Sequence, residues 1–139
     1  DDEIEKAAGL SIADIFTLHG EAEFRRGEKR VLARLLDDEP HILATGGGAY
    51  LDPETRKLLR ERAITVWLNA DLETLWERVS RRNHRPLLHQ PNPRGKLAQL
   101  LEERTPIYSE ADLVVESDDG PHTRTVDRIL AAVKRWQLA

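Results

Sequence analysis

The sequence has 139 residues, enough for one compact domain, and 40% of them are hydrophobic, enough for an apolar core. Charged residues make up 33% and the net charge is −4, which argues against a nucleic-acid-binding protein. Cysteine is absent, which excludes disulfides and thiolate metal sites, and no apolar run is long enough to span a bilayer. We therefore expect a cytoplasmic protein without a membrane or nucleic-acid partner.

The first part of the chain predicts three helices. Residues 1–8 form a short helix that ends at Gly9 in a left-handed cap. Ser11 is the N-cap of a second helix, which ends near Gly20. Apolar residues then recur on one face of the segment 21–36, which predicts the third helix.

The rest of the chain alternates between short apolar segments and amphipathic ones. Strands are predicted at 41–45 ("HILAT"), 64–70 ("ITVWLNA") and 111–117 ("ADLVVES"). Helices are predicted at 53–62, 72–79, 96–110 and 122–137, and a loop at 83–95. Such alternation requires right-handed crossovers, so we expect one domain over 1–139, a three-layer α/β/α fold with a mostly parallel sheet.

Three consecutive glycines, Gly46, Gly47 and Gly48, follow the first predicted strand. The carboxyl ends of parallel strands are where such sheets bind ligands. Glycines let the backbone approach a ligand closely and leave N–H groups free to donate. A tight exit from the strand is the alternative, although three glycines exceed what a turn needs.

Two arginines on predicted helices could bind a carboxylate, because the guanidinium fork matches it in geometry. Arg25 lies beside the apolar face of its helix, and Glu28, three residues on, could hold it in place. The alternative is a solvated ion pair without function. Arg104 stands near the end of another helix, where pairing with Glu102 or Glu103 is the alternative.

A basic stretch follows the second predicted strand and its helix. It contains five arginines and no acid, namely Arg78, Arg81, Arg82, Arg85 and Arg94. Arg85 stands in the irregular segment "RPLL", and an arginine that closes over a phosphoryl group there would stabilise developing charge and exclude water. An exposed basic loop is the alternative. A nucleic-acid patch is disfavoured because no aromatic residue is interleaved for stacking.

Several of these segments occur in one order: Asp1 with "IE", then "SIADIF", "GEAEFRRGE", "TGGGA", "RPLL" and "ERTPIY". The series resembles the shikimate kinase family, small P-loop kinases of aromatic amino-acid biosynthesis, over residues 1 to about 130. The resemblance implies the P-loop NTPase fold of the nucleoside monophosphate kinase type. It also implies phosphorylation of shikimate at its 3-hydroxyl by ATP, with Mg²⁺ as cofactor, in a cytoplasmic monomer.

On the acceptor side, the resemblance implies a role for each candidate residue. Asp1 would accept a hydrogen bond from the 3-hydroxyl and help to orient or deprotonate it. Arg25, held by Glu28, would clamp the shikimate carboxylate together with Arg104. The glycine turn 46–48 would contact the ring through its backbone.

On the nucleotide side, the resemblance implies a lid at about 81–95, in which Arg85 would reach the transferring phosphate. Adenine would lie near Arg78 and Pro121. No phosphate-binding loop of the form G-x-x-x-x-G-K-[ST] occurs in these 139 residues. We accordingly expect the phosphate site, and the acid linked to the metal, in residues upstream of Asp1.

The beginning of the chain supports that expectation, because it starts with Asp1 and contains no methionine. The family's first strand lies in the middle of the sheet and precedes the phosphate-binding loop. Without it we expect residues 1–139 alone to be neither a stable domain nor an active kinase. A shikimate-binding remnant without kinase activity is one alternative function. A related small-metabolite kinase, such as a gluconate kinase, is another.

Overall fold

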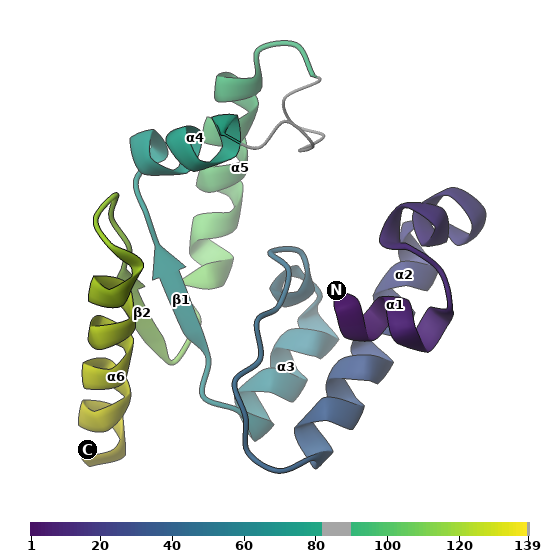
Figure 1. The fold of residues 1–139 in the computed structure, drawn as a ribbon, viewed down its shortest axis with the longest axis horizontal. Coiled ribbons are helices and arrows are strands. Elements are labelled where there is room, and N and C mark those ends of the chain that lie inside the picture. The colour runs from purple at the N-terminus through teal and green to yellow at the C-terminus, as the bar shows by residue number, and fades with distance from the viewer. Residues whose placement is uncertain (82–89, 139) are drawn as a thin grey trace. The chain divides into compact units, whose positions relative to one another are not determined.

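The computed structural model describes residues 1–81 and 90–138. They belong to two compact units, Asp1–Ala63 and Ile64–Ala139, whose helices and strands are labelled in Figure 1. The single domain expected over 1–139 stays a prediction. In the described part of the chain, no helix has both the length and the apolar character needed to cross a membrane.

The first unit begins with two helices, α1 (Asp2–Ala8) and α2 (Ile12–Asp37). Gly9 ends α1 with φ of 69°, in the left-handed region predicted for it, and the side chain of Ser11 caps α2. Gly20 leaves helical geometry at φ 81° and ψ 172°, so α2 consists of two helical segments joined at a kink. These are the second and third helices that the sequence predicts.

Apolar residues of α1 and α2 form the core of this unit. The buried members recur on the inner face of each helix, as the amphipathic pattern predicts. They are Ile4, Ile15, Phe24 and Val31, with Leu10, Ile12 and Leu35 packed against them. The core therefore fixes which face of α2 turns outward.

The glycines lead into a short 3-10 helix, η1 (Ala49–Leu51), and then into α3 (Pro53–Arg62), with the bounds predicted from the sequence. Asp52 caps α3, because its carboxylate accepts hydrogen bonds from Thr55 N at 3.0 Å and Thr55 Oγ1 at 2.8 Å. Proline at the first helical position favours the same start.

The prediction of a buried strand at 41–45 is wrong. These residues form no strand, and the side chain of Ile42 is 98% exposed. A strand needs a neighbour to pair its N–H and C=O groups, and no other strand lies in the unit Asp1–Ala63. The apolar run alone therefore does not produce a strand.

The second unit contains the sheet. Strands β1 (Val66–Asn69) and β2 (Leu113–Glu116) pair in parallel, with Val66 opposite Leu113. Both are shorter than the predicted segments. The helices of this unit are α4 (Leu72–Ser80), α5 (Pro93–Tyr108) and α6 (His122–Leu138).

Helix α5 starts at Pro93, three residues before the predicted start at 96. The predicted loop 83–95 is therefore wrong for residues 93–95, which are helical. The side chain of Asn92 caps the helix by accepting from Gly95 N at 3.3 Å, and Pro93 occupies the first helical position. Residues 82–89 of that loop lie outside the described residues.

Helices lie on both faces of the sheet (Figure 1). On one face α6 packs against β2, where Val115 is 4% exposed. On the other face the rings of Trp67 and Tyr108, the latter on α5, have centroids 6.0 Å apart. Neighbours along a strand point to opposite faces, and Trp67 pairs with Val114. This parallel, two-sided arrangement confirms the predicted α/β class.

Asp52 supplies the first test. Replacing it with Ala removes the cap of α3, so Asp52→Ala should lower the free energy of unfolding by about 1 kcal/mol in urea titrations. Asp52→Asn should lose less, because its amide oxygen can still accept from Thr55 N. An unchanged urea midpoint in Asp52→Ala would show that the cap does not stabilise α3.

The effect of Asp52→Ala should also depend on pH. Desolvation raises the pKa of Asp52, but hydrogen bonds from Thr55 and Lys29 outweigh it, so the pKa lies below its ordinary value. A carboxyl with a lowered pKa stabilises the fold above the unfolded value of about 3.9 and loses this effect as pH falls through the folded pKa. The parent and Asp52→Ala should therefore converge in stability as the pH falls below about 4.

Candidate functional site

Arg25 and the glycine turn lie together in the first unit. A Cβ atom built on Gly48 would overlap Nη2 of Arg25 and lie 2.8 Å from its Cζ. The guanidinium therefore lies against the backbone at a position where only glycine leaves room for it. The sequence analysis assigned Arg25 and the glycine turn to one acidic ligand. In the structure, Arg25 lies against Gly48 of that turn.

Glu28 fixes the guanidinium of Arg25. Its carboxylate is only 4% exposed and accepts from Nη1 of Arg25 at 2.8 Å, whereas the Arg25 side chain is 30% exposed. The Cζ of Arg25 also lies 5.0 Å from the centre of the Phe24 ring. A buried carboxylate is costly unless it is paired. The predicted i, i+3 contact is present, and its carboxylate end is buried rather than solvated.

Lys29 connects α2 to the segment that follows the glycines. Its ammonium lies 2.5 Å from Oε2 of Glu54 and 3.3 Å from Oδ2 of Asp52. The pKa of Lys29 is raised, first by the hydrogen bond to Glu54 and also by Asp52, against some desolvation. The sequence analysis missed this residue. Its position four residues after Arg25, on the same side of the helix, is the signal that could have found it.

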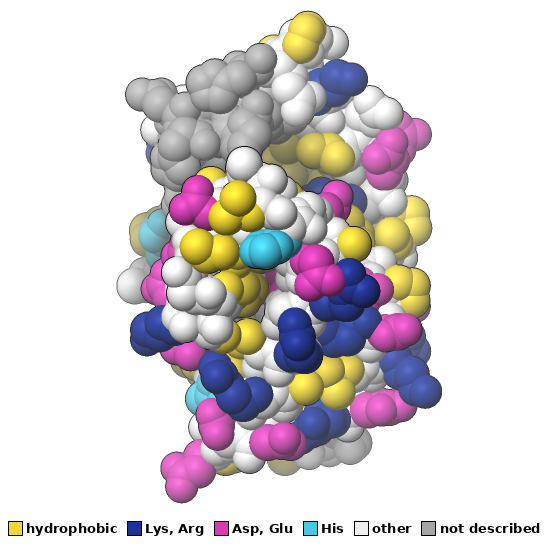
Figure 2. Space-filling model, turned by 90° about the vertical axis from the view of Figure 1, so that its right-hand side faces the viewer, with side chains coloured by type: hydrophobic (Ala, Val, Ile, Leu, Met, Phe, Trp, Pro, Cys, Tyr) yellow, Lys and Arg dark blue, Asp and Glu magenta, His cyan; other side chains and the backbone are white. Residues whose placement is uncertain are grey.

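Asp1 stands at the start of α1 and is exposed. Its backbone carbonyl accepts from Glu5 N at 2.9 Å, and its carboxylate does not cap the helix. Figure 2 shows acidic and basic side chains interspersed on the face with α1 and α2, where Glu3 pairs with Lys6 and Arg34. The role of Asp1 toward a substrate hydroxyl stays a prediction.

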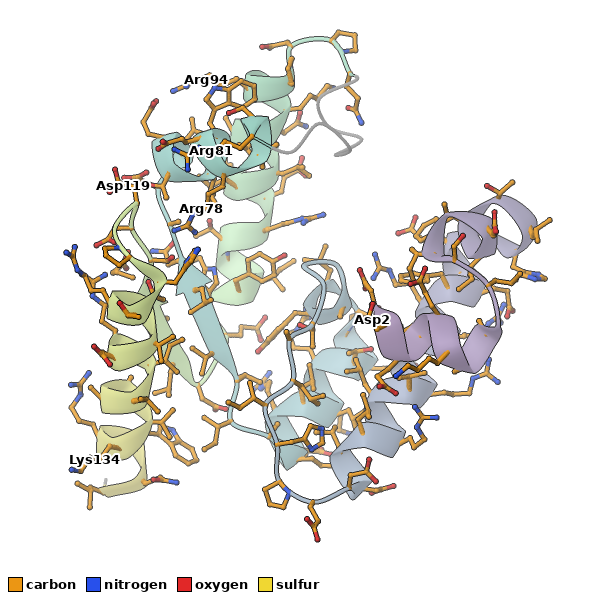
Figure 3. The ribbon with its side chains drawn as sticks, viewed as in Figure 1. Asp2, Arg78, Arg81, Arg94, Asp119 and Lys134 are labelled. Atoms are coloured by element: carbon orange, nitrogen blue, oxygen red, sulfur yellow. The ribbon has the colours of Figure 1, made fainter. Side chains whose placement is uncertain are left out.

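Arg78 contacts the loop between β2 and α6 in the second unit. Its Nη2 donates to Ser117 Oγ at 2.9 Å and to the carbonyl of Asp118 at 2.5 Å. Figure 3 shows Arg78 below α4, near the loop that carries Asp119. Pro121 ends the same loop, immediately before α6. Arg78 and Pro121, which the resemblance assigns to adenine, are thus connected through the loop between β2 and α6: Arg78 binds its start, and Pro121 ends it.

A hollow of about 530 Å³ opens beside this loop. Ser117 and Asp118 line it together with Asp71, at the start of α4, and Arg128 on α6. Its volume is in the range of small-molecule pockets, and it lies at the carboxyl end of β2.

Arg104 is half-buried in α5 and makes no ion pair with any residue of 1–81 or 90–138. The alternative pairing with Glu102 or Glu103 is therefore not found there, and Glu103 instead accepts from Gln99 at 3.0 Å. Arg25 and Arg104 belong to different units. A joint clamp on one carboxylate stays a prediction.

The basic stretch is partly neutralised by α4. Arg81 pairs with Glu77, and Arg94 pairs with Glu73. Figure 3 labels both arginines. Sequence reasoning counted the arginines of 78–94 without the two acids just before them in α4. Arg85 lies outside the described residues, as does most of the predicted lid 81–95.

The geometry defines a parallel α/β protein with an arginine aimed at a glycine turn. The shikimate kinase family model matches residues 1–134. Shikimate kinase of Caulobacter vibrioides strain NA1000 is 52% identical over 135 residues, covering 97% of this chain and 68% of that protein. Shikimate kinase of Rhodopseudomonas palustris is 50% identical over 139 residues, covering 100% and 68%.

Solved structures agree with this relationship. Shikimate kinase from Acinetobacter baumannii in complex with shikimate has a TM-score of 0.89 at 37% identity, covering 100% of this chain and 78% of that chain. Shikimate kinase from Aquifex aeolicus has a TM-score of 0.82 at 36% identity, covering 96% and 78%. The chain belongs to the shikimate kinase family, which confirms the resemblance and the predicted fold.

Gly48 supplies the second test. Its φ of −77° and ψ of −20° suit any residue, so Gly48→Ala adds no backbone strain. The new methyl group should instead displace the guanidinium of Arg25 from the turn and lower the free energy of unfolding, because the buried Glu28 carboxylate then loses part of its pairing. The side-chain Nε–H resonance of Arg25 in an NMR spectrum should shift.

Gly46→Ala is the matched control, because a Cβ there meets no atom within 4 Å. The Arg25 resonance should stay in place in this variant. If it stays in place in both variants, the contact between Arg25 and Gly48 is not formed in solution.

Proposed function

We propose that the protein transfers the terminal phosphoryl group of ATP to the 3-hydroxyl of shikimate. It acts in the shikimate pathway of aromatic amino-acid biosynthesis, as a monomer in the cytoplasm. The observation that carries the proposal is the guanidinium of Arg25, fixed by buried Glu28 and directed at Gly48, in a chain of the shikimate kinase family. One of the family's solved relatives is in complex with shikimate.

The acceptor half of the site binds the acid and orients its hydroxyl. Arg25 offers a planar fork to the carboxylate, with Arg104 as its partner in the clamp. The backbone at 46–48 contacts the ring where no side chain intervenes. Asp1 accepts a hydrogen bond from the 3-hydroxyl and draws its oxygen toward the phosphoryl group.

The nucleotide half holds the base and neutralises charge on the phosphates. Arg78, anchored to the 117–118 loop, and Pro121 hold adenine between them. Arg85 approaches the transferring phosphoryl group. No cluster of three or more His, Asp or Glu side chains able to hold a metal occurs in the described ranges. Mg²⁺ bound with the nucleotide would neutralise charge on the phosphates, while the residues of this chain supply positioning.

The decisive experiment measures phosphoryl transfer from ATP to shikimate, with gluconate as the competing acceptor. It compares residues 1–139 with the product of the complete reading frame. Calorimetry with shikimate and with ATP, each alone, accompanies the assay. Shikimate binding without turnover in both proteins would favour the shikimate-binding remnant. Turnover of gluconate in place of shikimate would overturn the proposed substrate.

Arg25→Ala should chiefly weaken shikimate binding. Loss of charge-assisted hydrogen bonds to a carboxylate should raise KM for shikimate by about 10- to 100-fold, with kcat changed far less. The neighbouring Arg26, which is exposed and pairs with Glu23, supplies the control. Arg26→Ala should keep both constants. Equal losses in KM and kcat for Arg25→Ala would contradict the assignment.

Arg85→Ala should chiefly lower turnover, because this arginine stabilises charge that develops during transfer. We expect kcat to fall by about 10²- to 10³-fold and KM for shikimate to change little. Steady-state kinetics with saturating ATP measure both constants. A variant that raises KM for shikimate while keeping kcat would place Arg85 in acceptor binding instead.

A further inference from the structure

Arg128, on α6, bridges the end of β2 and the loop that follows. Its Nη1 donates to the backbone carbonyl of Glu116 at 2.9 Å, and its Nη2 donates to Oδ2 of Asp118 at 3.1 Å. One guanidinium thus spans the last residue of the strand and the second residue of the loop. A planar fork can make both contacts at once without bending the loop.

The Asp118 carboxylate, held by Arg128, also binds the backbone of the loop. Its Oδ1 accepts from Gly120 N at 2.9 Å, which closes a tight turn inside the loop. Arg124 lies farther away, at 3.6 Å from Oδ2. The hydrogen bond from Gly120 lowers the pKa of Asp118, and Arg128 and Arg124 lower it further, against some desolvation. The carboxylate therefore keeps its charge, and its hold on the loop, at neutral pH.

The same loop residue holds Arg78 through its main chain. The carbonyl of Asp118 and the hydroxyl of Ser117, which is 9% exposed, both accept from Nη2 of Arg78. Both bonds use one terminal nitrogen of the planar guanidinium. They fix the orientation of that plane and leave its faces free of hydrogen bonds, which is the geometry that stacking on a flat ring requires.

We propose that Arg128 is a positioning residue for the base-binding half of the nucleotide site, acting through Asp118 to orient Arg78 for stacking on a purine. The inference rests on the proposed function, since that function places adenine at Arg78. Sequence separation hides the connection, because Arg78 lies 40 residues from Asp118 and Arg128 lies 10 residues beyond it.

The experiment can separate positioning from stability. The side chains of Arg128 and Asp118 are 38% and 36% exposed, and ion pairs so open to solvent contribute little to stability. Arg128→Ala should therefore fold. Lys134→Ala is the matched control, because Lys134 is an exposed cation of α6 that makes no ion pair with a described residue and does not line the hollow. Arg128→Lys keeps one donor group and should restore part of the effect.

The first measurement is the dissociation constant for ADP with Mg²⁺, obtained by calorimetry on the protein and its variants. Arg78→Ala should weaken ADP binding by about tenfold through loss of stacking. Arg128→Ala should weaken it by about three- to tenfold, and the double variant should match Arg78→Ala within about twofold. The dissociation constant for shikimate should not change in any of them. Parental ADP affinity in Arg128→Ala, or additive losses in the double variant, would overturn the inference.

The second measurement needs no nucleotide. The guanidinium protons of Arg78, bonded to the loop, should exchange with water faster in Arg128→Ala than in the parent or in Lys134→Ala. Unchanged exchange would overturn the positioning role even if ADP binding changed. The exchange of the Arg78 protons could rise in Arg128→Ala while Arg78→Ala binds ADP like the parent. In that case Arg78 does not bind the base, so the proposed base site is wrong, and with it the inference that rests on it.

Discussion

The proposed acceptor site depends on one buried ion pair. Glu28 is a carboxylate in the apolar interior of the first unit, and such a group is tolerated only with a partner. Arg25 is that partner, so its guanidinium cannot swing into solvent without leaving a charge unpaired. The cost of breaking this pair keeps the Arg25 fork in place before any ligand arrives. Glycine at position 48 then becomes a requirement, since a side chain there would occupy the space of the fork.

Arg25 and Arg78 are held in the same manner, although they belong to different units. Each uses one terminal nitrogen to bind an oxygen of its surroundings, the Glu28 carboxylate for Arg25 and the 117–118 loop for Arg78. These bonds orient each guanidinium, and Nε of Arg25 also lies 3.8 Å from Oε1 of Glu21. Catalysis of phosphoryl transfer depends mainly on positioning and electrostatic stabilisation, and guanidinium groups in fixed orientations provide both.

Sequence predicted best what depends on near neighbours. The cap at Ser11 acts over three residues, so a short stretch contains all the information required. The strand at 41–45 failed because pairing depends on a distant segment, which no local pattern supplies. The ion pair of Arg25 and Glu28 was predictable for the same local reason, whereas the burial that makes it significant follows from tertiary packing.

This distinction between near and distant partners also separates the two halves of the proposed site. Arg25 takes its restraint from its own helix, three residues away, so the orientation of its fork survives as long as α2 stays folded on its core. Arg78 takes its restraint from a loop about 40 residues away, which in turn depends on α6. The link between Arg128 and Asp118 is half-exposed and contributes little to stability. The proposed base-binding half is therefore more open to change by substitutions outside it than the orientation of Arg25, which local structure fixes.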